Sequence, residues 1–185
     1  MHSQDTCKNK FLMGEFQVKI LILYYSRTGT TRSLANYLAN KLKCDHEEII
    51  DTVDRSGPIG YLLAGKDATL RRLTKIKKFH HDPKRYDLVI LGMPVWAYKM
   101  PPAIRSCLKY LDKEKNFAFF ATQGSNGADS TFKELEQLLK NPAATLVLTT
   151  AEVRRFQFKQ EAALFIKKIQ KYSASRNSRY HMCRP

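Results

Sequence analysis

Cysteine is scarce in this chain, and no two cysteines are close in sequence. The four cysteines, at positions 7, 44, 107 and 183, are scattered over 185 residues, and no CxxC motif occurs. This spacing supports neither a zinc site nor a dithiol redox motif. We therefore expect reduced thiols in a cytoplasmic protein, and we predict no metal site.

Long apolar runs are also lacking. The longest unbroken run covers residues 20–25, whereas a membrane-spanning helix needs about 20 apolar residues. The first 17 residues carry four charged side chains and no long apolar core, so we expect no secretory signal. A length of 185 residues with 43% hydrophobic and 26% charged residues is typical of one globular domain.

Acidic residues are few for a chain of this length. Asp and Glu number 17 against 32 Lys and Arg, which gives a net charge of +15. Much of the excess lies in residues 66–85 and 153–185. Such a charge attracts nucleic acid, anionic lipid or acidic proteins. Because no nucleic-acid-binding signature is present, specific nucleic-acid binding is a remote alternative, and peripheral contact of the basic tail with a membrane stays open.

Apolar strand-like and helix-like segments alternate along the chain. We predict strands over residues 18–25, 47–52, 87–92, 116–122 and 145–150, and helices over 31–43, 59–73, 101–111, 131–139 and 159–172. We expect the helix over 59–73 to have a basic outer face. Strict alternation predicts an α/β fold, a doubly wound five-stranded parallel sheet of order 2-1-3-4-5 with helices on both faces. We expect one domain over 17–172, with loose tails over 1–16 and 173–185.

In such sheets a ligand binds beyond the carboxyl ends of the strands, near the point where the strand order reverses. The loop after the first strand is rich in hydroxyls and directly precedes a helix. It consists of Ser26, Arg27, Thr28, Gly29, Thr30 and Thr31. The free N–H groups of a helix start attract an anion, so these residues predict a phosphate cup. An ordinary Ser/Thr helix cap is the alternative, and for Arg27 we favour a position facing solvent over one on the anion.

The pattern S-x-T-G-x-T after an apolar strand resembles the flavodoxin family. The segment Gly92–Ala97 is similar to the G-x-P-V-W-A form of flavodoxin-like proteins and quinone-reductase relatives. The resemblance implies that FMN is the cofactor and that residues 26–31 hold its phosphate. It also implies that Trp96, or less favoured Tyr98, lies against the flavin, and that the loop after the fourth strand contacts the pyrimidine edge. The remaining residues expected at the cofactor are Pro94, Val95, Ala97, Thr122, Gln123, Gly124, Ser125 and Gly127.

The loops after the third and fourth strands each have a simpler interpretation as well. Trp96 could pack at the edge of the core, and the Gly/Asn loop could do no more than cap the next helix, with Asp129 as N-cap. Residues 54–57 follow the second strand; they either shape a substrate pocket or form only a turn, and we favour the turn.

Two features depart from the flavodoxin pattern. Ala97 stands where many flavodoxins have glycine, and its Cβ disfavours a positive φ. The chain is basic, whereas electron-carrying flavodoxins are acidic. Both features favour an oxidoreductase that passes electrons from NAD(P)H or a partner reductase to a quinone or another acceptor. The alternative is a one-electron carrier that docks an acidic redox protein. We name no catalytic side chain, because the cofactor carries the chemistry.

Overall fold

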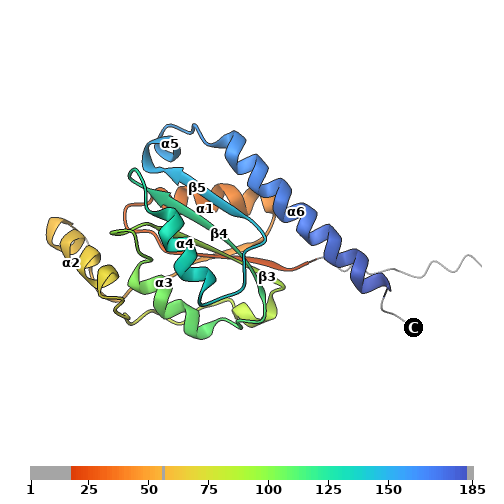
Figure 1. Cartoon of the computed structure of the whole chain (residues 1–185), viewed down its shortest axis with the longest axis horizontal. Coiled ribbons are helices and arrows are strands. Elements are labelled where there is room, and N and C mark those ends of the chain that lie inside the picture. Colours follow the sequence, from red (N-terminus) through yellow and green to blue (C-terminus); the bar gives the residue numbers. More distant parts are fainter. Residues whose placement is uncertain (1–17, 56, 183–185) are drawn as a thin grey trace, which may run out of the picture.

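A five-stranded parallel sheet organises the fold. The computed structural model describes residues 18–55 and 57–182, and its strands lie in the order β2-β1-β3-β4-β5 (Figure 1). All four strand pairs are parallel. The predicted fold class and strand order are therefore confirmed. The strands are β1 (Ile20–Tyr24), β2 (Asp45–Glu48), β3 (Leu88–Pro94), β4 (Asn116–Gln123) and β5 (Thr145–Thr149).

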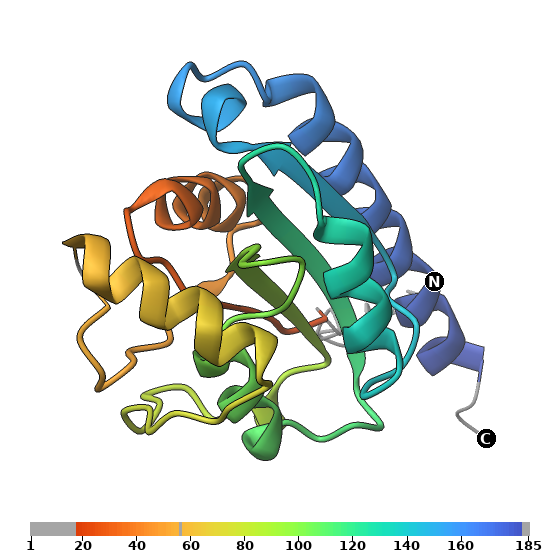
Figure 2. The same cartoon turned by 60° about the vertical axis from the view of Figure 1, so that its left-hand side comes forward.

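Helices cover both faces of this sheet, because successive side chains of a strand point to opposite faces. In β1, for example, Leu21 and Leu23 belong to one core cluster and Ile22 to the other. The first cluster packs under α2, α3 and α4, and the second under α1 and α6 (Figure 2). The helices are α1 (Thr30–Leu42), α2 (Gly57–Thr69), α3 (Pro102–Cys107), α4 (Ala128–Glu136), α5 (Thr150–Arg154) and α6 (Lys159–Met182), with short 3₁₀ turns at Pro83–Arg85 and Leu108–Tyr110.

The second strand is shorter and begins earlier than the predicted range 47–52. Its pairing with β1 ends at Glu48, which lies opposite Tyr24, the last residue of β1. The chain beyond it leaves the sheet and pairs antiparallel with residues 75–77, where the N–H of Thr52 donates to the carbonyl of Lys75 at 3.0 Å. The strand thus ends where its partner ends, although the apolar pattern continues.

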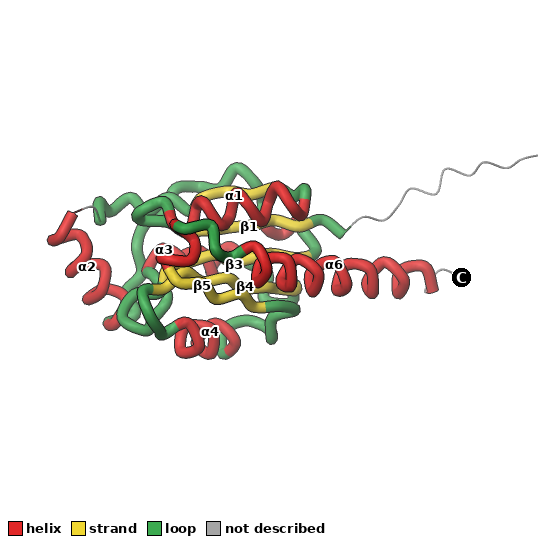
Figure 3. The backbone as a smooth tube through the Cα atoms, turned by 90° about the horizontal axis from the view of Figure 1, so that it is seen from above, coloured by secondary structure: helices red, strands yellow, loops and turns green. Residues whose placement is uncertain are grey.

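The predicted loose tail beyond residue 172 is wrong up to residue 182. Helix α6 continues to Met182 and runs past the end of the sheet (Figure 3). Residues 159–182 contain neither glycine nor proline, the two residues that most strongly stop helices. The expected N-terminal tail, residues 1–16, lies outside the described residues.

Helix α2 also differs from the prediction of a basic outer face. Its exposed side is aliphatic: Ile59 and Leu62 are 75% and 71% exposed, while Ala64 and Ala68 are buried against the core. The helices of the described residues include none with the length and apolar character to cross a membrane.

Candidate functional site

The loops after β1, β3 and β4 meet at the carboxyl edge of the sheet. The end of β3 lies beside the end of β4, with Pro94 opposite Thr122, and the N–H of Val95 donates to the carbonyl of Thr122 at 2.9 Å. The hydroxyls of Thr31 and Thr122 are 2.7 Å apart and buried, which joins the first loop to β4. Parallel pairing thus brings the three loops together, as the strand order predicts.

The first loop leaves the start of α1 open. The N-cap is Gly29 with φ of 88°, and among the described residues no side chain caps the first turn. The first turn also has no acidic residue. The alternative of an ordinary Ser/Thr cap is therefore not what the structure shows. The open end presents backbone N–H groups and the positive end of the helix dipole to whatever lies in front of it.

The hydroxyls of this loop have different roles. Ser26 Oγ accepts from the N–H of Gly29 at 3.1 Å, which shapes the turn. Thr31 is buried, and its hydroxyl forms a hydrogen bond with that of Thr122. Thr28 is exposed, and its hydroxyl lies 3.5 Å from that of Thr30. Because Ser26 Oγ is an acceptor in its bond, its own proton stays available to a ligand.

The second loop is a tight hairpin turn with two left-handed residues. Trp96 and Lys99 exchange both backbone hydrogen bonds, at 3.1 and 2.9 Å. Between them, Ala97 has φ of 46° and Tyr98 φ of 63°. Turns with two such residues favour glycine and asparagine, so neither side chain suits its position. Ala97 therefore adopts the positive φ that its Cβ disfavours.

The two aromatic residues of this turn face different surroundings. Trp96 is 7% exposed and belongs to the core cluster, with its ring edge-on to Tyr25 at 5.4 Å. Tyr98 is 55% exposed. The sequence favoured Trp96 as the ring against a ligand, whereas the structure buries it at the core edge. Tyr98 has the accessible ring.

Gln123 fixes the shape of the third loop from within. Its side-chain nitrogen donates to the carbonyl of Ser125 at 3.2 Å, and its side-chain oxygen accepts from the N–H of Ala128 at 2.9 Å. The next helix, α4, is capped by Gly127 with φ of 108°, not by Asp129. A Cβ on Gly127 would lie 3.0 Å from Tyr98, so the second and third loops are in contact. Gly124 and Ser125 stay exposed at the tip.

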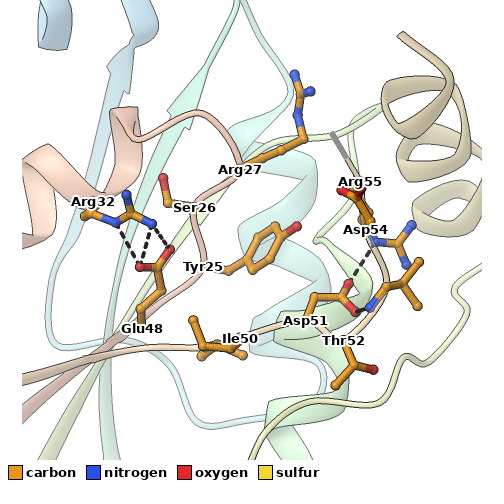
Figure 4. A pocket seen from close by; sticks show the side chains of 12 residues that line it. Tyr25, Ser26, Arg27, Arg32, Glu48, Ile50, Asp51, Thr52, Asp54 and Arg55 are labelled. Atoms are coloured by element: carbon orange, nitrogen blue, oxygen red, sulfur yellow. Dashed lines mark hydrogen bonds and ion pairs between the residues drawn. The ribbon is translucent and has the colours of Figure 1, made fainter. Parts of the chain in front are cut away.

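A pocket of about 390 Å³ borders the first loop on the β2 side (Figure 4). Figure 4 shows the Tyr25 ring between two ion pairs, Arg32 with Glu48 on one side and Arg55 with Asp51 on the other. Arg27 is half-exposed at its rim. Residues 51–55 line this pocket, so the first two residues of the 54–57 segment, for which the sequence favoured a turn, lie at the pocket, and Gly57 begins α2.

Arg55 belongs to the segment over residues 54–57 for which the sequence favoured only a turn, and its ion pairs were not predicted. It is buried and bonds both Asp51 and Asp67 at 2.8 Å. Asp51 in turn accepts from the hydroxyl of Thr74 at 2.6 Å. The Asp51–Arg55 spacing of four was a weak signal, but Asp67 lies on α2 and only the fold brings it close. This network fixes the pocket wall to α2.

The Tyr25 side chain is a neutral phenol. Burial, and after it the negative charge of Asp51, raises the pKa of Tyr25 to about 12. At neutral pH its hydroxyl therefore keeps its proton and can donate a hydrogen bond.

The residues at this edge fit FMN. An open helix start, hydroxyl donors and a glycine with nothing within 4 Å of a Cβ suit a phosphate. The exposed Tyr98 ring suits an aromatic plane, and the exposed backbone around Gly124 suits polar ring atoms. Each part of the cofactor thus has residues of matching chemistry.

The comparisons with known proteins agree with this fit. The profile of the family described as "NADPH-dependent FMN reductase" matches residues 18–167. No curated protein matches the chain. The chain is similar in fold to the crystal structure of a flavoprotein in complex with FMN from Lactobacillus acidophilus NCFM, with 22% identity over 76% of this chain and 99% of that chain and a TM-score of 0.61.

The NMR structure of the apo-form of the Lactobacillus acidophilus flavoprotein gives a TM-score of 0.56 at 21% identity, over 75% of this chain and 97% of that chain. An apo-form NADH:FMN oxidoreductase gives 0.52 at 14% identity, over 85% and 90%. At these identities the structures show the fold, and the profile shows the family. The chain belongs to the NADPH-dependent FMN reductase family and is an FMN-binding redox protein with a flavodoxin-like fold.

Proposed function

We propose that this protein is an oxidoreductase that uses FMN to pass electrons from NAD(P)H to a quinone or another small acceptor. Bound FMN would supply the redox chemistry by accepting a hydride and passing its electrons on. The family description supports a nicotinamide donor. The protein's own residues would bind and orient the cofactor and limit the access of water.

The phosphate would lie at the start of α1. The first-turn N–H groups of Thr30 and Thr31 and the hydroxyls of Ser26 and Thr28 are the donors in reach of that position. No carboxylate in the first turn opposes an anion. Arg27, half-exposed beside the loop, adds positive charge.

The flavin ring would lie against the second and third loops, which contact each other at Tyr98 and Gly127. Tyr98 would stack on it, and Trp96 would support the turn from the core side, as its contact with Tyr25 indicates. Pro94, Val95 and Ala97 would contribute backbone. The third loop would face the pyrimidine edge through Gly124 and Ser125, while Thr122, Gln123 and Gly127 hold its shape.

The single observation that supports this proposal is the uncapped start of α1 at the same edge of the sheet as the exposed Tyr98. The residues that would hold the phosphate and the residue that would stack on the ring follow different strands of that sheet, β1 and β3. The pocket on the β2 side, bounded by the Tyr25 hydroxyl, then supplies a place for part of a donor or acceptor.

The test begins with FMN reconstitution and an assay of NADPH and NADH oxidation with a quinone acceptor. We expect turnover without a partner protein. Thr28→Asp places a carboxylate in the phosphate cup and should weaken FMN binding at least about tenfold by charge repulsion. Asn40→Asp, at the exposed far end of the same helix, is the matched control and should bind FMN normally. Equal FMN affinity of both variants would refute the phosphate placement.

A one-electron carrier remains the second candidate because Ala97 already has the positive φ that a flavodoxin loop needs. The Cβ of Ala97 therefore does not argue against a carrier, although the sequence analysis used it as evidence for the reductase. Dithionite titration of the FMN-loaded protein separates the two functions. Direct passage to fully reduced flavin supports the reductase, and accumulation of one-electron-reduced flavin supports the carrier.

A further inference from the structure

The outward face of α2 carries large aliphatic side chains that no other part of the described structure covers. Ile59 and Leu62 are 75% and 71% exposed, and Leu63, Leu70 and Leu73 are also exposed. Ile59, Leu62 and Leu63 lie three and four residues apart and therefore share one side of the helix, whereas Leu70 and Leu73 follow just after its end at Thr69. On the inward side, Ala64 and Ala68 are buried against the core. Several large exposed aliphatic residues close together in sequence point to an interaction surface.

Exposed basic residues lie in and directly after this helix. Six basic residues along the same stretch are all exposed: Lys66, Arg71, Arg72, Lys75, Lys77 and Lys78. The one acidic residue among them, Asp67, is bonded to Arg55 and Arg72, and Arg71 pairs with Glu134 at 3.2 Å, so the positive charge of this surface comes mainly from its four lysines. We use the term "α2 surface" for the five aliphatic residues together with these six basic ones. The α2 surface therefore combines apolar character with net positive charge.

The shape and charge of the α2 surface favour one kind of partner. The helix projects from the body at the edge of the molecule, so its aliphatic side is convex (Figures 1 and 3). A second copy of this chain would bring its own cations against these and repel them, since each copy carries +15. A bilayer with anionic headgroups accepts a convex apolar stripe and attracts the cations beside it.

We propose that the α2 surface docks this protein on membranes that contain anionic phospholipid. Ile59, Leu62 and Leu63 enter the interface between headgroups and acyl chains, and the lysines of residues 75–78 lie at the headgroup phosphates. The docking requires no turnover and no cofactor, so it stands independently of the proposed oxidoreductase activity.

The test is co-sedimentation of the full chain with vesicles of phosphatidylcholine alone, and of phosphatidylcholine with about 30 mol % phosphatidylserine. We expect binding to the mixed vesicles and at least about tenfold weaker binding to the neutral ones. Ile59→Gln with Leu62→Gln should weaken binding to mixed vesicles about tenfold, because the apolar contact is lost. Lys77→Gln with Lys78→Gln should weaken it by a similar factor.

Matched controls come from α6, which lies on the opposite side of the molecule from α2 (Figure 1). Leu164→Gln removes a leucine that is also exposed, and Lys167→Gln with Lys168→Gln removes two exposed charges. We expect both controls to bind vesicles like the unmodified protein. Because all these side chains are exposed, circular dichroism should show unchanged folding.

Three results would overturn the proposal. The first is equal binding to neutral and anionic vesicles. The second is a loss of binding that is the same for the α2 and α6 variants. The third is sedimentation of the unmodified protein as a dimer that Ile59→Gln with Leu62→Gln dissociates, without vesicle binding, which would assign the face to a second copy.

Discussion

At the scale of single residues, the methyl group of Ala97 strains the backbone of the second loop. Ala97 has φ of 46° inside a turn whose two ends are bonded as a hairpin. A residue with a Cβ pays about 1–2 kcal/mol for this conformation. Glycine avoids that strain, but its freedom in the unfolded chain costs about 0.4–1 kcal/mol.

We therefore expect Ala97→Gly to stabilise the protein by about 0.5 kcal/mol in urea unfolding. Ala163→Gly, in the exposed interior of α6, is the control and should destabilise it by about 1 kcal/mol. If both substitutions destabilise equally, Ala97 does not bear the strain that its backbone angle indicates.

Glu47 is a second residue with a measurable role. Its carboxylate accepts the backbone N–H groups of His80 and His81 at 2.8 and 2.9 Å. Burial alone would raise the pKa of Glu47, but these hydrogen bonds, from His81 first, lower it. A carboxyl with a lowered pKa stabilises the fold above its unfolded pKa of about 4.3, and that stability is lost as the pH falls through the folded value.

Glu47→Gln should therefore lower the free energy of unfolding at pH 7 by about 1–2 kcal/mol, the worth of hydrogen bonds to a charged group. The difference from the unmodified protein should shrink as the pH falls below about 4. Urea titrations at several pH values measure it, and a difference that grows on acidification would show that the sign is wrong.

At the scale of elements, two glycines of α2 differ in the space that is available for a side chain. A Cβ on Gly60 would lie 2.3 Å from the carbonyl carbon of Arg55, closer than real contacts allow. A Cβ on Gly65 would have no atom within 4 Å. Gly60 is thus the point where α2 packs on the loop that lines the pocket.

The expected results differ in sign. Gly60→Ala should destabilise the protein by about 1–3 kcal/mol through overpacking. Gly65→Ala should stabilise it by about 1 kcal/mol through helix propensity. Thermal and urea unfolding of the pair measure this difference, and equal effects would mean that α2 does not pack on Arg55 as described.

The elements also show what a sequence can and cannot predict. The strand order and the first loop follow from local signals, the apolar runs and the hydroxyls around Gly29. The exposure of Tyr98 in place of Trp96 depends on a turn that neither glycine nor asparagine marks. The contact of Arg55 with Asp67 and the end of β2 depend on partners elsewhere in the chain, and no local pattern records them.

At the scale of the whole molecule, cofactor binding should add to stability. A ligand that binds only the folded state at 100 times its dissociation constant adds about 2.7 kcal/mol. We expect FMN to raise the unfolding midpoint much more than the same concentration of riboflavin, because only FMN carries the phosphate that we propose lies at the open start of α1. Equal shifts would show that the flavin ring alone provides the binding energy.

The hydroxyl contact between Thr31 and Thr122 has a consequence for biosynthesis. The two residues lie 91 positions apart, and ribosomes add about 5–20 residues per second. Synthesis of the chain from the first loop to its partner strand, β4, therefore takes roughly 5–20 s. A nascent chain cannot complete the FMN site that we propose at this edge in that interval, so we expect the cofactor to be captured late in translation or after release from the ribosome.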